Sequence, residues 1–147
     1  MKLLSDNGNA FELRIVRYQY PAKSGCEYDD NWLIIEIDVT HPNGAWVSRD
    51  PSLLTNEVAA LSKWLREIEQ GNNKTDECEF IEPNLKFRLS NDRENFFVYF
   101  ELESRPNWMP TTYNFDDDLF VAFPIADVNL MLAAENLDHQ LLNCPPR

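Results

Sequence analysis

The stretch from Trp32 to Thr40, WLIIEIDVT, decides the fold class that this sequence predicts. Its side chains alternate between two faces, which is the period of a strand with one buried and one solvated side. One face carries Leu33, Ile35, Ile37 and Val39, and the other carries Trp32, Ile34, Glu36, Asp38 and Thr40. Alternation of this kind favours an antiparallel sheet, because the strands of parallel sheets are buried on both faces and lose it.

The same period of two returns on both sides of this stretch. It predicts strands over residues 10–19, 85–89, 96–102 and 119–124. Two shorter strands are predicted at 45–48, which can pair back after the turn Pro42-Asn43-Gly44, and at 80–82, which Pro83 ends. Residues 22–31 and 104–117 are predicted as loops from their Gly, Pro, Asn and Asp content.

Two segments change to a helical period. Leu54, Val58, Leu61, Leu65 and Ile68 recur at spacings of 4, 3, 4 and 3, with Thr55 as the predicted N-cap and Gly71 after the last turn. A second helix follows Asp127 as its predicted cap and carries Leu130, Ala134, Leu137 and Leu141. The sequence therefore predicts one α+β domain over residues 1–147, with a single antiparallel sheet of about six strands and two helices packed on one face.

The composition indicates which partners the chain can attract. Its 147 residues include 25 acidic and 13 basic side chains, so the formal net charge is −12. Such a surface repels phosphate, which argues against binding to nucleic acid or to an anionic membrane, and it favours a basic protein partner. The sequence shows no signal peptide and no apolar run near the roughly 20 residues that span a bilayer. Three widely spaced cysteines, Cys26, Cys78 and Cys144, predict reduced thiols and a cytoplasmic location.

Patterns that carry catalytic or metal chemistry are weak in this chain. His41 and His139 are far apart, and no C-x-x-C pair, nucleophile elbow or Gly-rich phosphate loop is present. A Cys–His pair between distant positions stays open. The acidic runs Asp29-Asp30 and Asp116-Asp117-Asp118 are more typical of solvated turns than of catalysts. We therefore predict no catalytic, metal-binding or cofactor-binding residue and no enzyme.

The solvated face of the predicted sheet is the more informative feature. By alternation it carries Glu12, Arg14, Trp32, Ile34, Glu36, Asp38, Lys86, Arg88, Phe97, Tyr99, Glu101 and Glu103. One interpretation is cross-strand pairing between opposite charges and between aromatic rings. The other is a surface of aromatic anchors rimmed with carboxylates that binds a basic protein. For that surface the predicted partner-binding residues are Glu36, Asp38, Tyr99, Glu101, Glu103, Trp108, Asp116, Asp117 and Asp118, although Trp108 fits a lid over the core equally well.

Several strings along nearly the whole chain resemble the WapI family of bacterial immunity proteins. The two most specific are Glu82-Pro83-Asn84-Leu85 and Glu103-Ser104-Arg105-Pro106. The others include Phe11-Glu12-Leu13, Tyr18-Gln19-Tyr20-Pro21, Asn31-Trp32-Leu33, Leu53-Leu54-Thr55, Glu57-Val58, Trp64-Leu65, Trp108 and the closing Pro145-Pro146-Arg147.

This resemblance implies a cytoplasmic protein that binds and neutralises the variable C-terminal domain of a secreted toxin delivered by neighbouring cells. The toxin of the type member cleaves transfer RNA, so the resemblance implies a nuclease as partner and supplies no catalytic residue. The alternative is a small-ligand-binding domain or an enzyme with a cleft between sheet and helices, which a large apolar pocket would favour.

Overall fold

The computed structural model describes residues 1–108 and 119–147 and confirms the α+β class. Eight strands, three helices and two short 3₁₀ helices follow one another in these residues. In chain order they are β1 (Lys2–Leu4), β2 (Ala10–Tyr18), α1 (Glu27–Asn31), β3 (Trp32–His41), β4 (Gly44–Leu54), α2 (Thr55–Glu69), β5 (Glu77–Cys78), β6 (Leu85–Leu89), β7 (Asn95–Phe100), η1 (Leu102–Ser104), β8 (Phe120–Pro124), η2 (Ile125–Asp127) and α3 (Leu130–Leu141).

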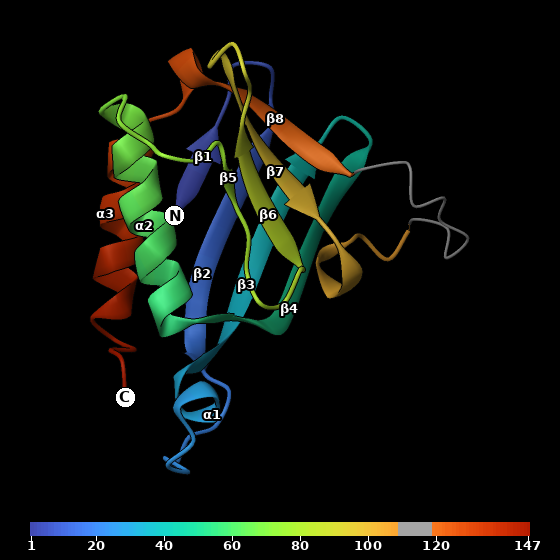
Figure 1. Cartoon of the computed structure of the whole chain (residues 1–147). Helices are drawn as coiled ribbons and strands as arrows, with labels where there is room; N and C mark the ends of the chain where they lie inside the picture. Colours follow the sequence, from blue (N-terminus) through green and yellow to red (C-terminus); the bar gives the residue numbers. More distant parts are fainter. Residues whose placement is uncertain (109–118) are drawn as a thin grey trace.

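The strands form two antiparallel sheets of four, which corrects the predicted single sheet of about six strands. Sheet A has the order β1-β2-β3-β4 and sheet B the order β5-β6-β7-β8. Helix α2 follows β4 directly, so the ladder of sheet A ends there and a second ladder begins after the helix (Figure 1). Alternation reports only that one face of a strand is buried, and two stacked sheets produce the same pattern as one continuous sheet.

The core lies between the two sheets. Leu33, Ile35, Ile37 and Val39 are all buried, as predicted. Aromatic rings join the inner faces: the ring of Phe11 in β2 lies 5.9 Å from those of Phe87 and Phe100, which belong to sheet B. Each sheet therefore covers the buried face of the other, which the prediction assigned to the helices.

Helices α2 and α3 lie side by side along one flank of the sheets (Figure 1). Ser62 Oγ of α2 donates to the carbonyl of Ala134 in α3 over 3.1 Å. The pair contacts both sheets, because the Trp64 ring lies 5.8 Å from that of Phe96 in β7, and Gln140 accepts a 2.6 Å hydrogen bond from the Ile15 N–H in β2. The helices therefore close a flank shared by the two sheets.

Both predicted helix caps lie one or two residues from the observed ones. Thr55 is the first helical residue, and its hydroxyl donates to Asn31 Oδ1, whereas the Glu57 carboxylate accepts from the N–H of Leu54 before the helix. Asp127 belongs to η2, and Asn129 caps α3 by accepting from the Leu132 N–H. In each case another side chain with an oxygen acceptor lies within two residues, and sequence spacing does not separate such neighbours.

The strand ends also differ from the prediction. The strand expected at 80–82 lies instead at Glu77–Cys78, and β4 runs to Leu54, well beyond the expected 45–48. Leu102, expected at the end of a strand, is 56% exposed in η1 with a φ of 47°. Helix α1 and strand β1 were not predicted, because each is too short to show a period.

Candidate functional site

The predicted partner-binding residues are divided between two opposite outer faces. Glu36 and Asp38 lie on the outer face of sheet A, and Tyr99 lies on the outer face of sheet B. The single solvated surface predicted from the sequence is therefore wrong, because the strands that were expected to share a sheet belong to two.

The outer face of sheet A is a network of ion pairs. The Glu36 carboxylate accepts from Arg14 over 2.7 Å and also from Arg49, and these hydrogen bonds hold its pKa below the ordinary value. Arg14 also lies 3.0 Å from Glu12 and 4.0 Å from Asp38. Cross-strand pairing, the first of the two interpretations, describes this face.

The outer face of sheet B carries a cluster of aromatic rings. The Phe120 ring lies 5.3 Å from that of Phe97 and 5.4 Å from that of Tyr99, and Phe120 is 39% exposed. The ammonium group of Lys86 lies 4.7 Å from the centre of the Tyr99 ring, a cation–π contact. This face therefore offers apolar ring surface as well as charge.

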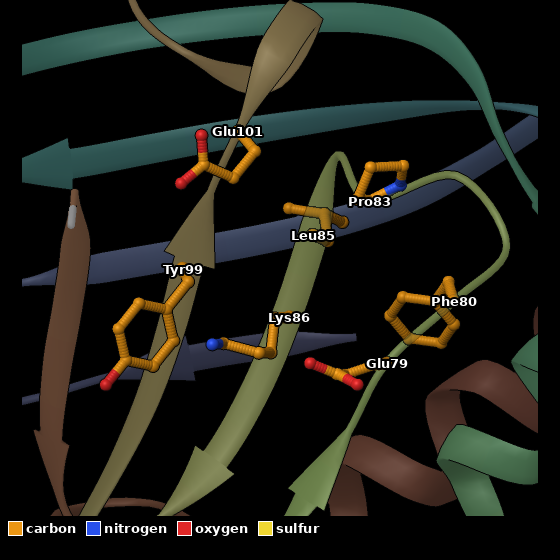
Figure 2. A pocket seen from close by; sticks show the side chains of 7 residues that line it. All are labelled: Glu79, Phe80, Pro83, Leu85, Lys86, Tyr99 and Glu101. Atoms are coloured by element: carbon orange, nitrogen blue, oxygen red, sulfur yellow. The ribbon is translucent and has the colours of Figure 1, made fainter. Parts of the chain in front are cut away.

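A hollow of about 260 Å³, which we call the sheet B pocket, opens beside this cluster. Figure 2 shows Lys86 extending towards Tyr99, with Glu79 and Phe80 on the other side of Lys86. Glu101 follows two residues after Tyr99 on the same segment. Pro83 and Leu85 complete the lining. The pocket brings together two of the predicted residues, Tyr99 and Glu101, and places carboxylates around an apolar floor.

A second and wider hollow, of about 470 Å³, lies where α1, β3, β4 and η1 approach one another. Four carboxylates and three aromatic rings line it, with no lysine or arginine among the lining residues. The lining consists of Gln19, Tyr20, Tyr28, Asp29, Trp32, Asp50, Pro51, Glu82 and Glu103. We call it the acidic hollow. Of the predicted partner-binding residues that the structure describes, only Glu103 lies in it.

The carboxylates of the acidic hollow have no cationic partner within the described residues. Asp29, Asp50, Glu82 and Glu103 each lie more than 4.0 Å from every basic nitrogen of residues 1–108 and 119–147. Burial raises the pKa of the Asp50 carboxyl, the negative charges of Glu103 and Glu82 raise it further, and a hydrogen bond from Asn84 opposes them. The hollow therefore gathers four carboxylates that form no ion pair within residues 1–108 and 119–147.

Most residues of this hollow were not predicted from the sequence as binding residues. Asp50 and Glu82 were not singled out, Asp29 was interpreted as part of a solvated turn, and Tyr20 and Tyr28 were placed in or beside a loop. The lining residues come from five separate segments, and only the path of the chain around α1 and η1 brings them together. No local spacing in the sequence signals this assembly.

The two sequence strings most specific for the family resemblance, 82–85 and 103–106, lie together where sheet A and sheet B are joined. The Asn84 carbonyl accepts from the Glu101 N–H over 2.9 Å and also from the Ser104 hydroxyl. The Asn84 side chain donates to Ser52 Oγ in β4 over 2.8 Å, and Trp46 Nε1 donates to the Ser104 carbonyl. The strings thus tie sheet A to sheet B, and they position Glu82, Glu101 and Glu103 at the borders of the two hollows.

The other predicted residues have separate positions. Trp108 is 45% exposed and packs at 6.1 Å against Trp46, so it partly covers a core ring, as the lid interpretation expects. Its role as a partner anchor stays a prediction. Asp116, Asp117 and Asp118 lie outside the described residues.

Residues 1–108 and 119–147 contain no group of three or more His, Cys, Asp and Glu side chains arranged to hold a metal ion. Within the same residues no helix is long and apolar enough to cross a membrane. The three cysteines are free thiols, exposed at Cys26 and buried at Cys144, and burial raises the pKa of Cys78 to about 11. No residue of α2 or α3 lines either hollow, so neither is the predicted cleft between sheet and helices.

These features define a small acidic α+β protein whose surface presents aromatic rings and carboxylates that form no ion pair within the described part of the chain. The chain belongs to the Immunity protein WapI-like family, whose family model matches residues 2–145. Membership confirms the resemblance seen in the sequence and implies a role in toxin immunity, with a toxin protein as the partner and binding as the mode of action. Comparisons with curated proteins and with solved structures return no match.

Proposed function

We propose that this protein binds and neutralises the toxic C-terminal domain of a secreted polymorphic toxin inside the cytoplasm of the cell that makes it. The family supports toxin immunity. The observation that carries the proposal is the acidic hollow, where exposed aromatic rings adjoin carboxylates without a cationic partner in the described residues. Aromatic anchors beside charges of one sign are typical of protein interfaces with a partner of the opposite sign.

A nuclease domain is the partner that fits this charge best. An enzyme that cleaves nucleic acid attracts phosphate with a basic surface. A chain of net charge −12 competes for the same electrostatic field and covers that surface. Neutralisation in this way is stoichiometric, and it requires no catalytic group in the immunity protein.

The pockets favour protein binding over the small-ligand alternative. The sheet B pocket, at about 260 Å³, is smaller than the roughly 300 to 1,000 Å³ of ordinary ligand sites. The acidic hollow is larger, but most of its lining side chains are either charged or exposed to solvent. A partner that spreads across both hollows fits this surface better than an enclosed small molecule does.

Co-expression with the toxin domain encoded beside this chain tests the proposal. Cells that express the toxin domain alone should stop growing, and cells that also express this chain should grow. The two proteins should co-purify in a 1:1 complex, and the released toxin should regain its activity after the complex is denatured and separated. The proposal fails if growth is not rescued, or if rescue occurs while the toxin domain is chemically altered.

A further inference from the structure

Three aromatic side chains in the acidic hollow offer exposed or half-buried ring surface. Tyr28 is 60% exposed and Tyr20 is 44% exposed, and Trp32 at the start of β3 is half-buried. Large aromatic surfaces are costly to leave in water, and their clustering in a concave region marks a place where a partner group is received. These exposed rings indicate a binding site even when the carboxylates around them are left out of account.

The carboxylates around these rings specify the charge of that group. Some acidic residues elsewhere in the chain have arginine partners: Glu36 contacts two arginines on sheet A, and Glu101 contacts Arg105 over 2.6 Å. In the hollow, Asp50 and Glu103 repel each other, and neither carboxylate lies within 4.0 Å of a basic nitrogen of the described residues. A cation supplied by a partner would remove this repulsion and add charge-assisted hydrogen bonds.

The combination of rings and carboxylates selects arginine among the cationic side chains. A guanidinium group is planar, so it stacks on an aromatic ring while its edge donates two parallel hydrogen bonds to a carboxylate. Lysine presents a point charge without a flat face. The chain already uses this chemistry next to the hollow, where the Arg147 guanidinium lies 3.4 Å from the centre of the Tyr18 ring and donates to the Tyr20 carbonyl.

We infer that the acidic hollow receives an arginine side chain of the toxin domain, stacked on its aromatic rings and bonded to Asp50 and Glu103. This inference rests on the proposed function, and it identifies the surface that binds the toxin domain. The arginine would be the anchor of the complex, and the sheet B pocket would lie at the edge of the interface.

The first arm of the test measures the affinity of the purified toxin domain for matched variants. The double variant Asp50→Asn with Glu103→Gln keeps the shape of the hollow and removes two charges. The control, Glu69→Gln with Glu135→Gln, removes two charges from exposed positions on α2 and α3. We expect the hollow variant to raise Kd at least about tenfold and the control to change it less than about threefold. Equal effects of the two variants, or no effect of either, would overturn the inference.

The second arm needs no toxin. N-acetyl-arginine amide is titrated into the isotope-labelled chain, with the neutral N-acetyl-citrulline amide as the matched probe. The indole N–H signal of Trp32 should shift saturably with the arginine probe, move little with the citrulline probe, and lose its response in the hollow variant. If the toxin domain does not bind the wild-type chain, the proposed function fails, and the inference is then tested by this arm alone. A shift of the Trp32 signal that occurs only with the arginine probe supports the inference. Equal responses to the two probes overturn it.

Discussion

The side-chain amide of Asn84 donates a 2.8 Å hydrogen bond to Ser52 Oγ, and this bond joins the loop before β6 in sheet B to β4 in sheet A. Both residues are buried. The Asn84 carbonyl binds η1 at the same time, so one residue fixes three segments that border the two hollows.

We predict that Asn84→Ala destabilises the protein by about 1–3 kcal/mol, because it leaves the buried Ser52 hydroxyl without its donor and opens a space between the sheets. Asn136→Ala, at an exposed position on α3, is the matched control and should change stability by less than about 0.5 kcal/mol. Urea unfolding followed by tryptophan fluorescence measures both. Equal midpoints for the two variants would show that the junction does not hold the sheets together.

Asp50→Asn should stabilise the chain at neutral pH. Because the folded state raises the pKa of Asp50, its ionisation costs stability as the pH rises above the ordinary pKa of an aspartate, and this cost is complete above the raised pKa. Asparagine stays neutral, so the variant should melt higher than the wild type near pH 7. The difference should shrink as the pH falls towards about 3, where the aspartate is protonated in both states.

Asp138→Asn should change the melting temperature near pH 7 in the opposite direction. Burial opposes ionisation there, but hydrogen bonds from Ser62 and Arg66 hold the pKa of Asp138 below its ordinary value. Its charge therefore stabilises the fold at neutral pH, and the variant should melt lower than the wild type. A lower melting temperature for Asp50→Asn as well would contradict the electrostatic account of the hollow.

Alternation along single strands was sufficient to predict the α+β class and the buried face of β3. It could not predict the division into two sheets, because Val39 or Phe87 is buried in the same way whether a helix or a second sheet covers it. It also placed Glu36 and Tyr99 on one surface, since strand periodicity carries no information about which strands share a sheet.

The proposed binding surface was harder to predict from the sequence than the fold. Tyr99, Glu101 and Glu103 were selected from one strand and its extension, and they border the two hollows. Asp50 and Glu82 gave no signal, because an isolated acidic residue has the same local pattern in a solvated turn and in a binding site. Only tertiary contacts distinguish the two.

Leu61 tests the packing of α2. This side chain is fully buried, so Leu61→Ala should cost about 2–5 kcal/mol through lost burial and a residual cavity. Leu132→Ala makes the same change at a position on α3 that is 53% exposed, and it should cost less than about 1 kcal/mol. Denaturant unfolding of both variants measures the difference, and similar losses would show that the apolar stripe of α2 is not packed.

The thiols should react in a fixed order. Cys26 is exposed, whereas burial raises the pKa of Cys78 to about 11 and leaves little thiolate at neutral pH. We expect one fast reaction with a disulfide reagent such as DTNB in the native protein, lost in Cys26→Ser and retained in Cys78→Ser. All three thiols should react at similar rates in denaturant, which serves as the control.

The rate of association with a basic toxin domain should depend on salt and on the acidic surface. Opposite net charges accelerate encounter at low ionic strength, and salt screens the attraction between charges farther apart than a Debye length, which is about 10 Å at 0.1 M salt. We expect the association rate to fall at least about tenfold between about 0.05 M and 0.5 M salt in stopped-flow mixing. The dissociation rate should change less, because contacts that are desolvated in the complex are screened weakly.

Charge reversal identifies which part of the surface steers the encounter. Glu82→Lys with Glu103→Lys reverses two charges beside the acidic hollow, and Glu69→Lys with Glu135→Lys makes the same change in net charge on the helices. Glu101 is left unchanged, because its carboxylate bonds to Arg105 and its reversal would disturb η1. The hollow variant should slow association more and flatten its salt dependence more than the helix variant. Equal slowing would show that net charge alone steers the toxin, and no slowing in either would exclude steering by the acidic surface.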